Sequence, residues 1–413
     1  MIKNVAILGA TGSIGTHALE VIEKHPDRFS IWGLTSHTRT ESCCALIKKF
    51  EPKVVAVSSE MASNVTKRLG DRTGSVELLE GDEGINKIAS ADEVDIVVAG
   101  IAGAAGFAST VAAIKAGKKV LIANKEPLVM LGSLLRKLVA KSGAEIVPID
   151  SEHNAIFQCL PLAAQVDCMS GGIDKSQGLL RHGVRGIILT ASGGPFLDTP
   201  LEAMVDITPD QAASHPKWNM GRKISIDSAT MMNKGLEMIE ACVLFGTAPQ
   251  DVEVVIHPES IVHSLVEYSD GSMIAQLANP DMRVAITAAL AYPERIQSGV
   301  GRLDLVQAGQ LNFRHPDDRR YPCLAIARQA AETGGAAPVI LNVANEVAVN
   351  AFCTGRLRFT DIPDFIHCAL DDYSNLAAND VTSIVRLDQL VRETLQNKLD
   401  TGATSLPQVM LGY

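Results

Sequence analysis

The chain has 413 residues, a formal net charge of −10 and eight cysteines. This length allows two or three domains with full cores, and the acidic balance argues against a nucleic-acid partner. No apolar run approaches the roughly 18 residues of a membrane span, and a strand from Lys3 leaves no room for a signal peptide. Since no cysteines have Cys-x-x-Cys spacing, we expect reduced thiols and a cytoplasmic protein.

A strand, a glycine-rich turn and a helix open the chain. Val5–Leu8 is apolar and runs into Gly-Ala-Thr-Gly-Ser-Ile-Gly, residues 9 to 15, and apolar residues at helical spacing follow. In this context such a turn is typical of dinucleotide sites, where a helix N-terminus faces the pyrophosphate. The spacing differs from Gly-x-Gly-x-x-Gly, so a purely structural turn is the alternative. The cofactor contacts expected here are Thr11, Gly12, Ser13 and Ile14.

The end of the second expected strand, Phe29–Leu34, bears on the choice between NAD and NADP. An NAD site usually has an acid there, which binds the ribose hydroxyls. This chain has hydroxyl residues and Arg39 instead, with no acid before Glu41. That pattern favours the 2′-phosphate of NADP, although Arg39 could equally be a solvated loop residue.

Further short apolar strands alternate with helical segments, which predicts a doubly wound parallel sheet. The polar group Asn124, Lys125 and Glu126 follows one of these strands, at the edge where such sheets bind ligands. We expect contacts with the ribose or nicotinamide of the cofactor, and ordinary loop polarity is the alternative. The strands expected here span residues 53–57, 94–99, 119–123 and 144–149.

Two carboxylates, Asp150 and Glu152, follow the last of these strands. On an extended backbone, residues i and i+2 point to the same side, so both side chains would enter one space. Paired anions need a cation or a shared proton, and oxygen ligands suit Mg²⁺ or Mn²⁺. The alternative is an acidic junction in which Asp150 or Ser151 caps a helix beginning near His153.

The middle of the chain contains a small-residue turn and a basic loop. Ser192 stands before Gly193 and Gly194, where backbone N–H groups and a hydroxyl could bind an anion, or form a plain turn. The segment from Ser214 to Lys223 combines Trp218 with several cations. This composition suggests a lid over an anionic ligand, with solvated charge as the alternative.

A polar segment on an expected helix comes next. Ser228, Asn233 and Lys234 offer hydroxyl, amide and ammonium donors for a phosphate. Glu237 lies one helical turn after Lys234 and is a candidate third carboxylate for the metal, with Glu240 as second choice. Either glutamate could instead be solvated or paired with Lys234.

Together these motifs resemble the 1-deoxy-D-xylulose 5-phosphate reductoisomerase family. The resemblance covers nearly the whole chain and includes Ala-Asn-Lys-Glu, Asp-Ser-Glu-His-Asn, Ser-Gly-Gly-Pro-Phe, His-Pro-Lys-Trp and Met-Met-Asn-Lys-Gly-Leu-Glu. It implies an α/β fold with a Rossmann-type NADP-binding domain (1–150), a central α/β catalytic and dimerisation domain (151–292), a linker (293–312) and a C-terminal helical bundle (313–413).

The resemblance also implies an activity. It is the rearrangement and reduction of 1-deoxy-D-xylulose 5-phosphate to 2-C-methyl-D-erythritol 4-phosphate, in the non-mevalonate route to isoprenoid precursors. The cofactors would be NADPH and Mg²⁺ or Mn²⁺, the partner a phosphorylated sugar, and the assembly a homodimer without nucleic acid or membrane. Rival interpretations are another NADP-dependent oxidoreductase and a non-catalytic nucleotide sensor.

The resemblance assigns roles to residues of this chain. The metal ligands would be Asp150, Glu152 and Glu237. The substrate would contact Ser151, Glu152, Ser192, His215, Ser228, Asn233, Lys234 and Glu237. Catalysis would involve Lys125, Ser151, Glu152, His153, His215 and Trp218, and Gly221 would join the cofactor set. Where the family commonly has Gly-Lys-Asn, this chain has His37-Thr38-Arg39, so the residue that reads the 2′-phosphate stays open, with Arg39 as candidate.

The C-terminal part predicts strands up to Leu277, joined at Asp270-Gly271, and helices from Tyr321 onward. His257 and His263 are expected to be sheet residues without a metal, and Met282 is only a weak candidate for the active site. Gln297 to Asn312 resembles a linker.

Overall fold

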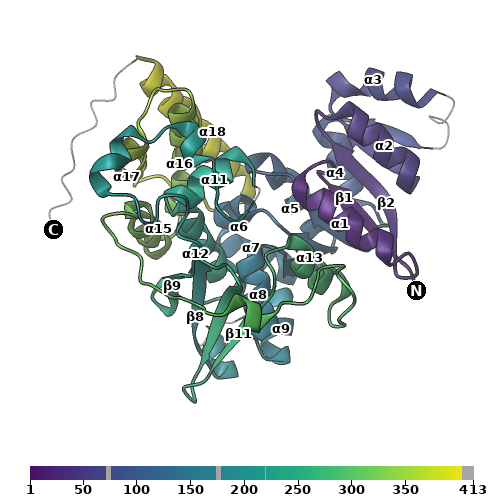
Figure 1. Ribbon diagram of the computed structural model, residues 1–413. Coiled ribbons are helices and arrows are strands. Elements are labelled where there is room, and N and C mark those ends of the chain that lie inside the picture. Colours follow the sequence, from purple (N-terminus) through teal and green to yellow (C-terminus); the bar gives the residue numbers. More distant parts are fainter. Residues whose placement is uncertain (71–75, 174–177, 219, 402–413) are drawn as a thin grey trace. The chain divides into compact units, whose positions relative to one another are not determined.

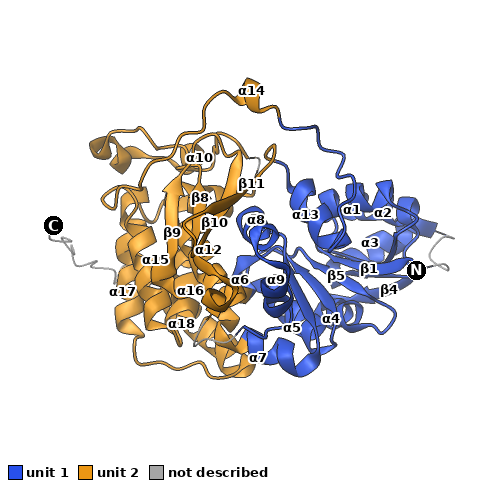
Figure 2. Ribbon diagram, turned by 90° about the horizontal axis from the view of Figure 1, so that it is seen from below, with its two compact units in different colours: residues 1–127, 135–173, 281–303 blue, residues 128–134, 174–280, 304–413 orange. Residues whose placement is uncertain are grey.

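A computed structural model describes residues 1–70, 76–173, 178–218 and 220–401. The chain forms two compact units, coloured separately in Figure 2. Unit 1 comprises Met1–Pro127, Leu135–Ile173 and Asp281–Leu303, and unit 2 comprises Leu128–Leu134, Asp174–Pro280 and Asp304–Tyr413. Among the described residues, no helix combines the length and the apolar character needed to cross a membrane. The finer division into three domains and a linker stays a prediction.

Unit 1 contains a seven-stranded sheet with the order β4-β3-β2-β1-β5-β6-β7, and all its neighbouring strands are parallel. The order reverses at β1, which pairs with β2 on one side and β5 on the other. This confirms the predicted Rossmann-type sheet, although β4 was not predicted. The strands are β1 (Lys3–Leu8), β2 (Phe29–Ser36), β3 (Val54–Val57), β4 (Glu77–Glu80), β5 (Ile96–Ala99), β6 (Lys119–Ile122) and β7 (Glu145–Pro148).

The helices of unit 1 bury one apolar face each against this sheet or against one another. In α1, Ala18, Val21 and Ile22 are buried, as their helical spacing predicts. The segment containing α13 returns to unit 1 late in the sequence and contacts α1, α8 and β6. The helices are α1 (Ser13–Lys24), α2 (Thr40–Phe50), α3 (Ser59–Leu69), α4 (Gly81–Ser90), α5 (Phe107–Lys115), α8 (Ser151–Cys159), α9 (Leu162–Met169) and α13 (Met282–Ala291).

Unit 2 contains a four-stranded sheet with the order β11-β10-β8-β9. The central strand β10 is antiparallel to both β11 and β8, whereas β8 and β9 are parallel. The hairpin at Asp270-Gly271 agrees with the sequence, but β9 was not predicted. The strands are β8 (Val184–Ala191), β9 (Val252–Ile256), β10 (Val262–Tyr268) and β11 (Met273–Leu277).

The long helix α12 of unit 2 contacts strands β8 and β9 as well as α15. At its contact with α15, a Cβ added at Gly235 would lie 2.4 Å from the Cβ of Ala327, so the close approach requires glycine. Beyond α15, helix α16 packs against α17 and α18, and Figure 1 shows α16 beside α18. The helices are α10 (Pro209–Ala212), α11 (Arg222–Ala229), α12 (Met232–Phe245), α14 (Leu305–Ala308), α15 (Pro322–Thr333), α16 (Ala337–Cys353), α17 (Ile362–Asp372) and α18 (Val381–Thr401).

Helical structure from Tyr321 onward therefore agrees with the sequence, and the α/β fold class is confirmed. The short helix α14 interrupts the segment that resembled a linker. Two further helices, α6 (Lys125–Leu131) and α7 (Ser133–Ser142), have residues in both units.

Candidate active site

The glycine-rich turn joins β1 to α1 at the point where the strand order reverses, which is where doubly wound sheets bind ligands. Gly9 has a φ of 81°, a conformation that other residues rarely adopt, and a Cβ there would lie 2.8 Å from the Gly100 oxygen. At Gly15, a Cβ would lie 2.4 Å from the Gly9 oxygen. The turn is therefore tight, and Ser13 and Ile14 open the helix that follows it. A helix N-terminus in this position is a common place for a phosphate group.

Polar contacts connect this turn to the end of β2. The hydroxyls of Thr11 and Ser36 lie 3.0 Å apart, and the Gly9 N–H donates to Oγ1 of Thr35 at 2.8 Å. Arg39 is exposed, and its Nη1 donates to the Thr11 carbonyl oxygen at 2.7 Å. Arg39 is thus bonded to the glycine-rich turn.

Three polar residues follow β6 at the expected edge of the sheet: Asn124, Lys125 and Glu126. Nδ2 of Asn124 is buried and makes no hydrogen bond within the described chain. An orphaned amide donor at this edge fits a cofactor with amide and ribose oxygens. Lys125 opens α6, and its Nζ lies 2.9 Å from Oδ2 of Asp150, while Glu126 is buried beside it.

Asp150 is the N-cap of α8, with its carboxylate accepting a bond from the Ser151 N–H at 2.9 Å. The extended geometry expected for Asp150 and Glu152 is therefore wrong, because β7 ends at Pro148 and the helix begins at Ser151. The helix cap does not exclude a metal site, because one carboxylate oxygen of Asp150 lies within 4.8 Å of one carboxylate oxygen of Glu152. Ser151 donates its hydroxyl proton to Glu152, and Nδ1 of the buried His153 lies 3.8 Å from Oδ2 of Asp150.

This donor set fits a divalent cation. Two carboxylates at such short range repel each other unless positive charge is present, and Lys125 supplies some of it in unit 1. Carboxylate oxygens are the ligands that Mg²⁺ and Mn²⁺ prefer.

In unit 2, the turn after β8 contains two consecutive glycines in the left-handed region. Gly193 and Gly194 have φ values of 84° and 69°, and a Cβ on Gly194 would lie 2.8 Å from the Ser228 oxygen. The turn and the end of α11 are therefore in contact. Ser192 Oγ accepts from the Gly194 N–H at 3.2 Å and lies 2.9 Å from Nε2 of His215.

The basic loop folds around the His215 ring. Nδ1 of His215 accepts hydrogen bonds from the backbone N–H groups of Lys217 at 3.2 Å and Trp218 at 2.9 Å. Trp218 is half-buried, with its ring centroid 6.4 Å from that of His263 in β10. The loop is shorter than expected because α11 begins at Arg222, and its residue 219 lies outside the described residues.

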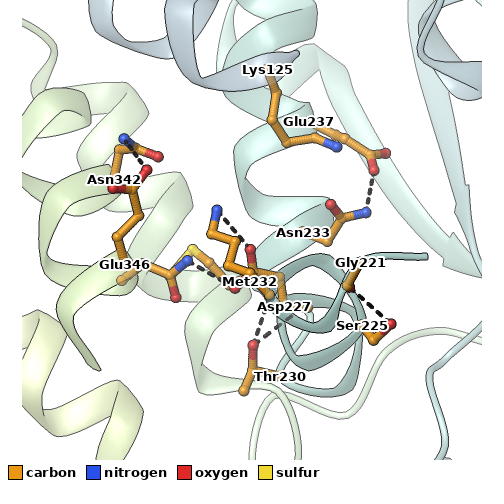
Figure 3. A network of polar contacts seen from close by, with 12 residues as sticks. Lys125, Gly221, Ser225, Asp227, Thr230, Met232, Asn233, Glu237, Asn342 and Glu346 are labelled. Carbon is orange, nitrogen blue, oxygen red and sulfur yellow. Dashed lines mark hydrogen bonds and ion pairs between the residues drawn. The ribbon is translucent and has the colours of Figure 1, made fainter. Parts of the chain in front are cut away.

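A sharp break separates α11 from α12. Met231 is buried and has a φ of 61°, which is rare and costly for a residue with a side chain. The break sets Ser228, at the end of α11, before Asn233 and Lys234 in the first turn of α12. Both Asn233 and Lys234 donate to the buried carboxylate of Glu237, as Figure 3 shows for Asn233.

Each unit thus gathers its own share of the predicted residues. Unit 1 brings the cofactor turn and Arg39 together, and groups Lys125 with Asp150, Glu152 and His153. Unit 2 brings Ser192, His215 and Ser228 together, and joins Asn233 and Lys234 to Glu237. Gly221 is exposed at the start of α11, and Glu240, the second-choice carboxylate, is buried in α12. The sequence assigned no role to Asp227, although its i+4 spacing from Lys223 signals an ion pair.

Three family models match the chain, and they describe 1-deoxy-D-xylulose 5-phosphate reductoisomerase over residues 5–132 and two C-terminal domains of that enzyme over residues 146–245 and 277–394. The 1-deoxy-D-xylulose 5-phosphate reductoisomerase of Pseudomonas putida is 52% identical over 392 residues, which are 95% of this chain and 95% of the relative. The chain belongs to the 1-deoxy-D-xylulose 5-phosphate reductoisomerase family.

Other family members agree across the same length. The reductoisomerase of Pseudomonas aeruginosa is 52% identical and covers 94% of both chains. A crystal structure of DOX-P reductoisomerase in complex with NADPH, fosmidomycin and magnesium is similar with a TM-score of 0.91 and 47% identity, over 98% of this chain and 100% of that one. The enzyme from Zymomonas mobilis in complex with NADPH has a TM-score of 0.87 and 38% identity, over 97% and 100% of the two chains.

Proposed function

We propose that this chain converts 1-deoxy-D-xylulose 5-phosphate to 2-C-methyl-D-erythritol 4-phosphate with NADPH and Mg²⁺ or Mn²⁺, in the non-mevalonate route to isoprenoid precursors. The observation that carries this proposal is the similarity over 98% of the chain to a reductoisomerase crystallised with NADPH, fosmidomycin and magnesium. When bound, the cation polarises the carbonyl of the substrate, and the nicotinamide supplies the hydride.

Unit 1 binds the cofactor in this proposal. Thr11, Gly12, Ser13 and Ile14 present the N-terminal backbone N–H groups of α1 to the pyrophosphate. Arg39 approaches the 2′-phosphate, since its guanidinium is exposed and already bonded to the turn at Thr11. Asn124 contacts the ribose or nicotinamide through its buried Nδ2, and Lys125 and Glu126 belong to the same set. Gly221, which is also proposed for this set, is a residue of unit 2.

Unit 2 binds the substrate phosphate. Because Nδ1 of His215 accepts two backbone N–H bonds, a neutral ring has its proton on Nε2 and donates it to Ser192 Oγ. Since Ser192 Oγ also accepts from Gly194, its own proton is available to a phosphate oxygen. Ser228 adds a hydroxyl at the end of α11. Asn233 and Lys234 add donors in the first turn of α12, where the helix dipole and the ammonium both favour an anion.

The metal ligands in this proposal are Asp150, Glu152 and Glu237. Asn233 and Lys234 orient the Glu237 carboxylate from within its own helix. Ser151 and Glu152 contact the reacting carbons, Lys125 and His153 lie around the same carboxylates, and Trp218 covers the carbon chain.

The test is NADPH oxidation with 1-deoxy-D-xylulose 5-phosphate, measured with Mn²⁺, with Mg²⁺ and after chelation, and with the product identified by NMR. We expect oxidation only with substrate and cation together. Oxidation that persists after chelation would indicate a different NADP-dependent oxidoreductase, and NADPH binding without turnover would indicate a nucleotide sensor.

We further propose a cytoplasmic homodimer in which the central residues 151–292 form the dimer interface. In the sequence this central domain follows a cofactor domain and precedes a helical domain that starts near residue 313. The edge strand β11 supports this, because Met273 and Ile274 on it are 55% and 48% exposed. Size-exclusion chromatography with light scattering should give twice the chain mass, and Ile274→Lys should shift it towards the monomer. A wild-type protein that elutes as a monomer would refute the dimer.

A further inference from the structure

Asp227 is a buried carboxylate in α11 that the proposed chemistry does not use. Its side chain is only 2% exposed. Oδ1 accepts a hydrogen bond from Nδ2 of the buried Asn345 in α16 at 2.8 Å, and Oδ2 lies 2.9 Å from Nζ of Lys223, one turn earlier in α11. A charge this deeply buried is tolerated only when it is paired and hydrogen-bonded, so both contacts matter to where the helix sits.

These contacts connect three parts of unit 2. Lys223 lies just after the basic loop, Asn345 belongs to the C-terminal helices, and Asp227 directly precedes Ser228. The neighbouring residue of Asn345, Glu346, pairs with Arg392 of α18 at 2.7 Å, so the helix that supplies the amide is itself fixed. Figure 3 shows Asp227 facing the helix that bears Asn342 and Glu346.

The end of α11 is also held by the turn at Gly193 and Gly194. Its Ser228 carbonyl packs against Gly194, where even one added carbon would approach to 2.8 Å. Thr230 Oγ1 donates to the Asp227 carbonyl at 3.2 Å and accepts from the Met232 N–H at 3.3 Å, which closes the break before α12. A rotation of α11 would therefore move the Ser228 hydroxyl relative to the Ser192 turn.

We propose that Asp227 is a positioning residue for the substrate phosphate: its carboxylate, paired with Lys223 and Asn345, fixes the rotation of α11 and directs Ser228 at the phosphate. This inference rests on the proposed function, in which Ser228 is a phosphate ligand. It predicts that loss of the carboxylate weakens phosphate binding and leaves the cofactor side of the enzyme unchanged.

The test compares Asp227→Asn and Lys223→Met with Asp210→Asn in the full-length protein. Asp210 of α10 forms an exposed ion pair at 2.8 Å with Arg222, the first residue of α11, and serves as the matched control. For Asp227→Asn and Lys223→Met we expect the KM for the substrate, and the Ki of inorganic phosphate as competitive inhibitor, to rise about tenfold, the effect of one misdirected hydrogen bond. The KM for NADPH should stay unchanged, and Asp210→Asn should behave as wild type.

A fourth variant, Lys223→Met combined with Asp227→Leu, separates positioning from folding. Replacing a buried ion pair by apolar residues often restores stability, and an Asn345→Leu background removes the buried amide that would otherwise lose its acceptor. In that background this variant should melt near wild type yet keep the raised KM and phosphate Ki. Wild-type constants in Asp227→Asn, an equal rise in the KM for NADPH, or recovery of phosphate binding in the double variant would each overturn the proposal. Inactive wild-type protein would instead refute the proposed function.

Discussion

The Ser192 hydroxyl lies 2.9 Å from Nε2 of His215, while Nδ1 of the same ring accepts a hydrogen bond from the Trp218 backbone N–H at 2.9 Å. One imidazole therefore connects the turn at Ser192, Gly193 and Gly194 to the basic loop. Its two nitrogens have opposite roles, because the backbone N–H groups fix Nδ1 as the acceptor.

Replacing His215 should consequently affect both contacts at once. We expect His215→Phe to raise the KM for the substrate about tenfold or more, since Ser192 loses its donor and the loop loses its acceptor. Steady-state kinetics with varied substrate would measure this. His182→Phe, at a half-buried position of unit 2, is the control substitution. A normal KM in His215→Phe would show that the ring does not shape the phosphate pocket.

The acidic pair at the start of α8 predicts a metal-specific defect. Glu152→Gln should lower kcat ~100-fold or more, because the loss of even an outer partner of a metal ligand costs up to that factor. Fluorescence titration should show unchanged NADPH affinity. Glu145→Gln, on an exposed side chain of β7, is the control. Full metal-dependent turnover in Glu152→Gln would remove this residue from the ligand set.

Arg39 should discriminate between the two nicotinamide cofactors. Because its guanidinium is tied to the cofactor turn, Arg39→Ala should raise the KM for NADPH about tenfold or more and change the KM for NADH little. Arg68→Ala breaks an exposed ion pair with Glu41 in the same unit and should alter neither constant. Equal effects of Arg39→Ala on both cofactors would mean that another group binds the 2′-phosphate.

Trp218 should behave as a ligand-covering residue and not as a core residue, because it is half-buried. We expect Trp218→Ala to raise the substrate KM about tenfold and to shift Tm by less than ~2 °C. In a Trp32→Phe background Trp218 is the remaining tryptophan, and its emission should change when a phosphonate analogue of the substrate binds. A variant that melts several degrees early but turns over normally would show that Trp218 supports the fold.

Tyr321 predicts a loss of stability at high pH. Burial raises the pKa of Tyr321 from 10.0 to about 12, and its hydroxyl donates to the Gly193 carbonyl at 2.8 Å. The folded protein binds this proton more tightly than the unfolded chain, so the stabilisation is complete below pH 10 and is lost as the pH rises through about 12.

Tyr321→Phe tests this directly. It should lower stability by ~1 kcal/mol at neutral pH, through loss of one buried hydrogen bond, and should flatten the alkaline decline. Denaturant unfolding at several pH values would measure both effects. Tyr373→Phe serves for comparison, because among the described residues the Tyr373 hydroxyl has no hydrogen bond to the turn at Gly193 and Gly194. An unchanged alkaline decline in Tyr321→Phe would assign that decline to other groups.

Local sequence patterns predicted what local physics determines. The apolar runs identified β1 and β2, the glycine spacing identified the turn at Gly9, and helical spacing placed Asn233 and Lys234 near Glu237. The extended geometry expected at Asp150 and Glu152 was wrong because β7 ends at Pro148, and Asp150 takes the alternative role of helix N-cap, which aspartate favours.

Contacts between distant residues were not predictable in this way. Asp227 and Asn345 are 118 positions apart, and no local pattern signals that an amide will meet that carboxylate. The strand β4 was missed because its Glu-Leu-Leu-Glu sequence has only two apolar residues, and its place follows from pairing with β3.

The late return of residues 281–303 to unit 1 has a consequence for the order of synthesis. This segment ties down α1 from the far end of the sequence: Arg283 pairs with Glu20 at 3.2 Å, and the ring of His25 bonds the Gln297 carbonyl at 2.7 Å. During translation the parallel sheet is complete in sequence well before these partners emerge from the ribosome. A chain stopped after residue 280 should therefore leave one face of α1 bare, which favours association with chaperones over release of a nucleotide-binding fragment.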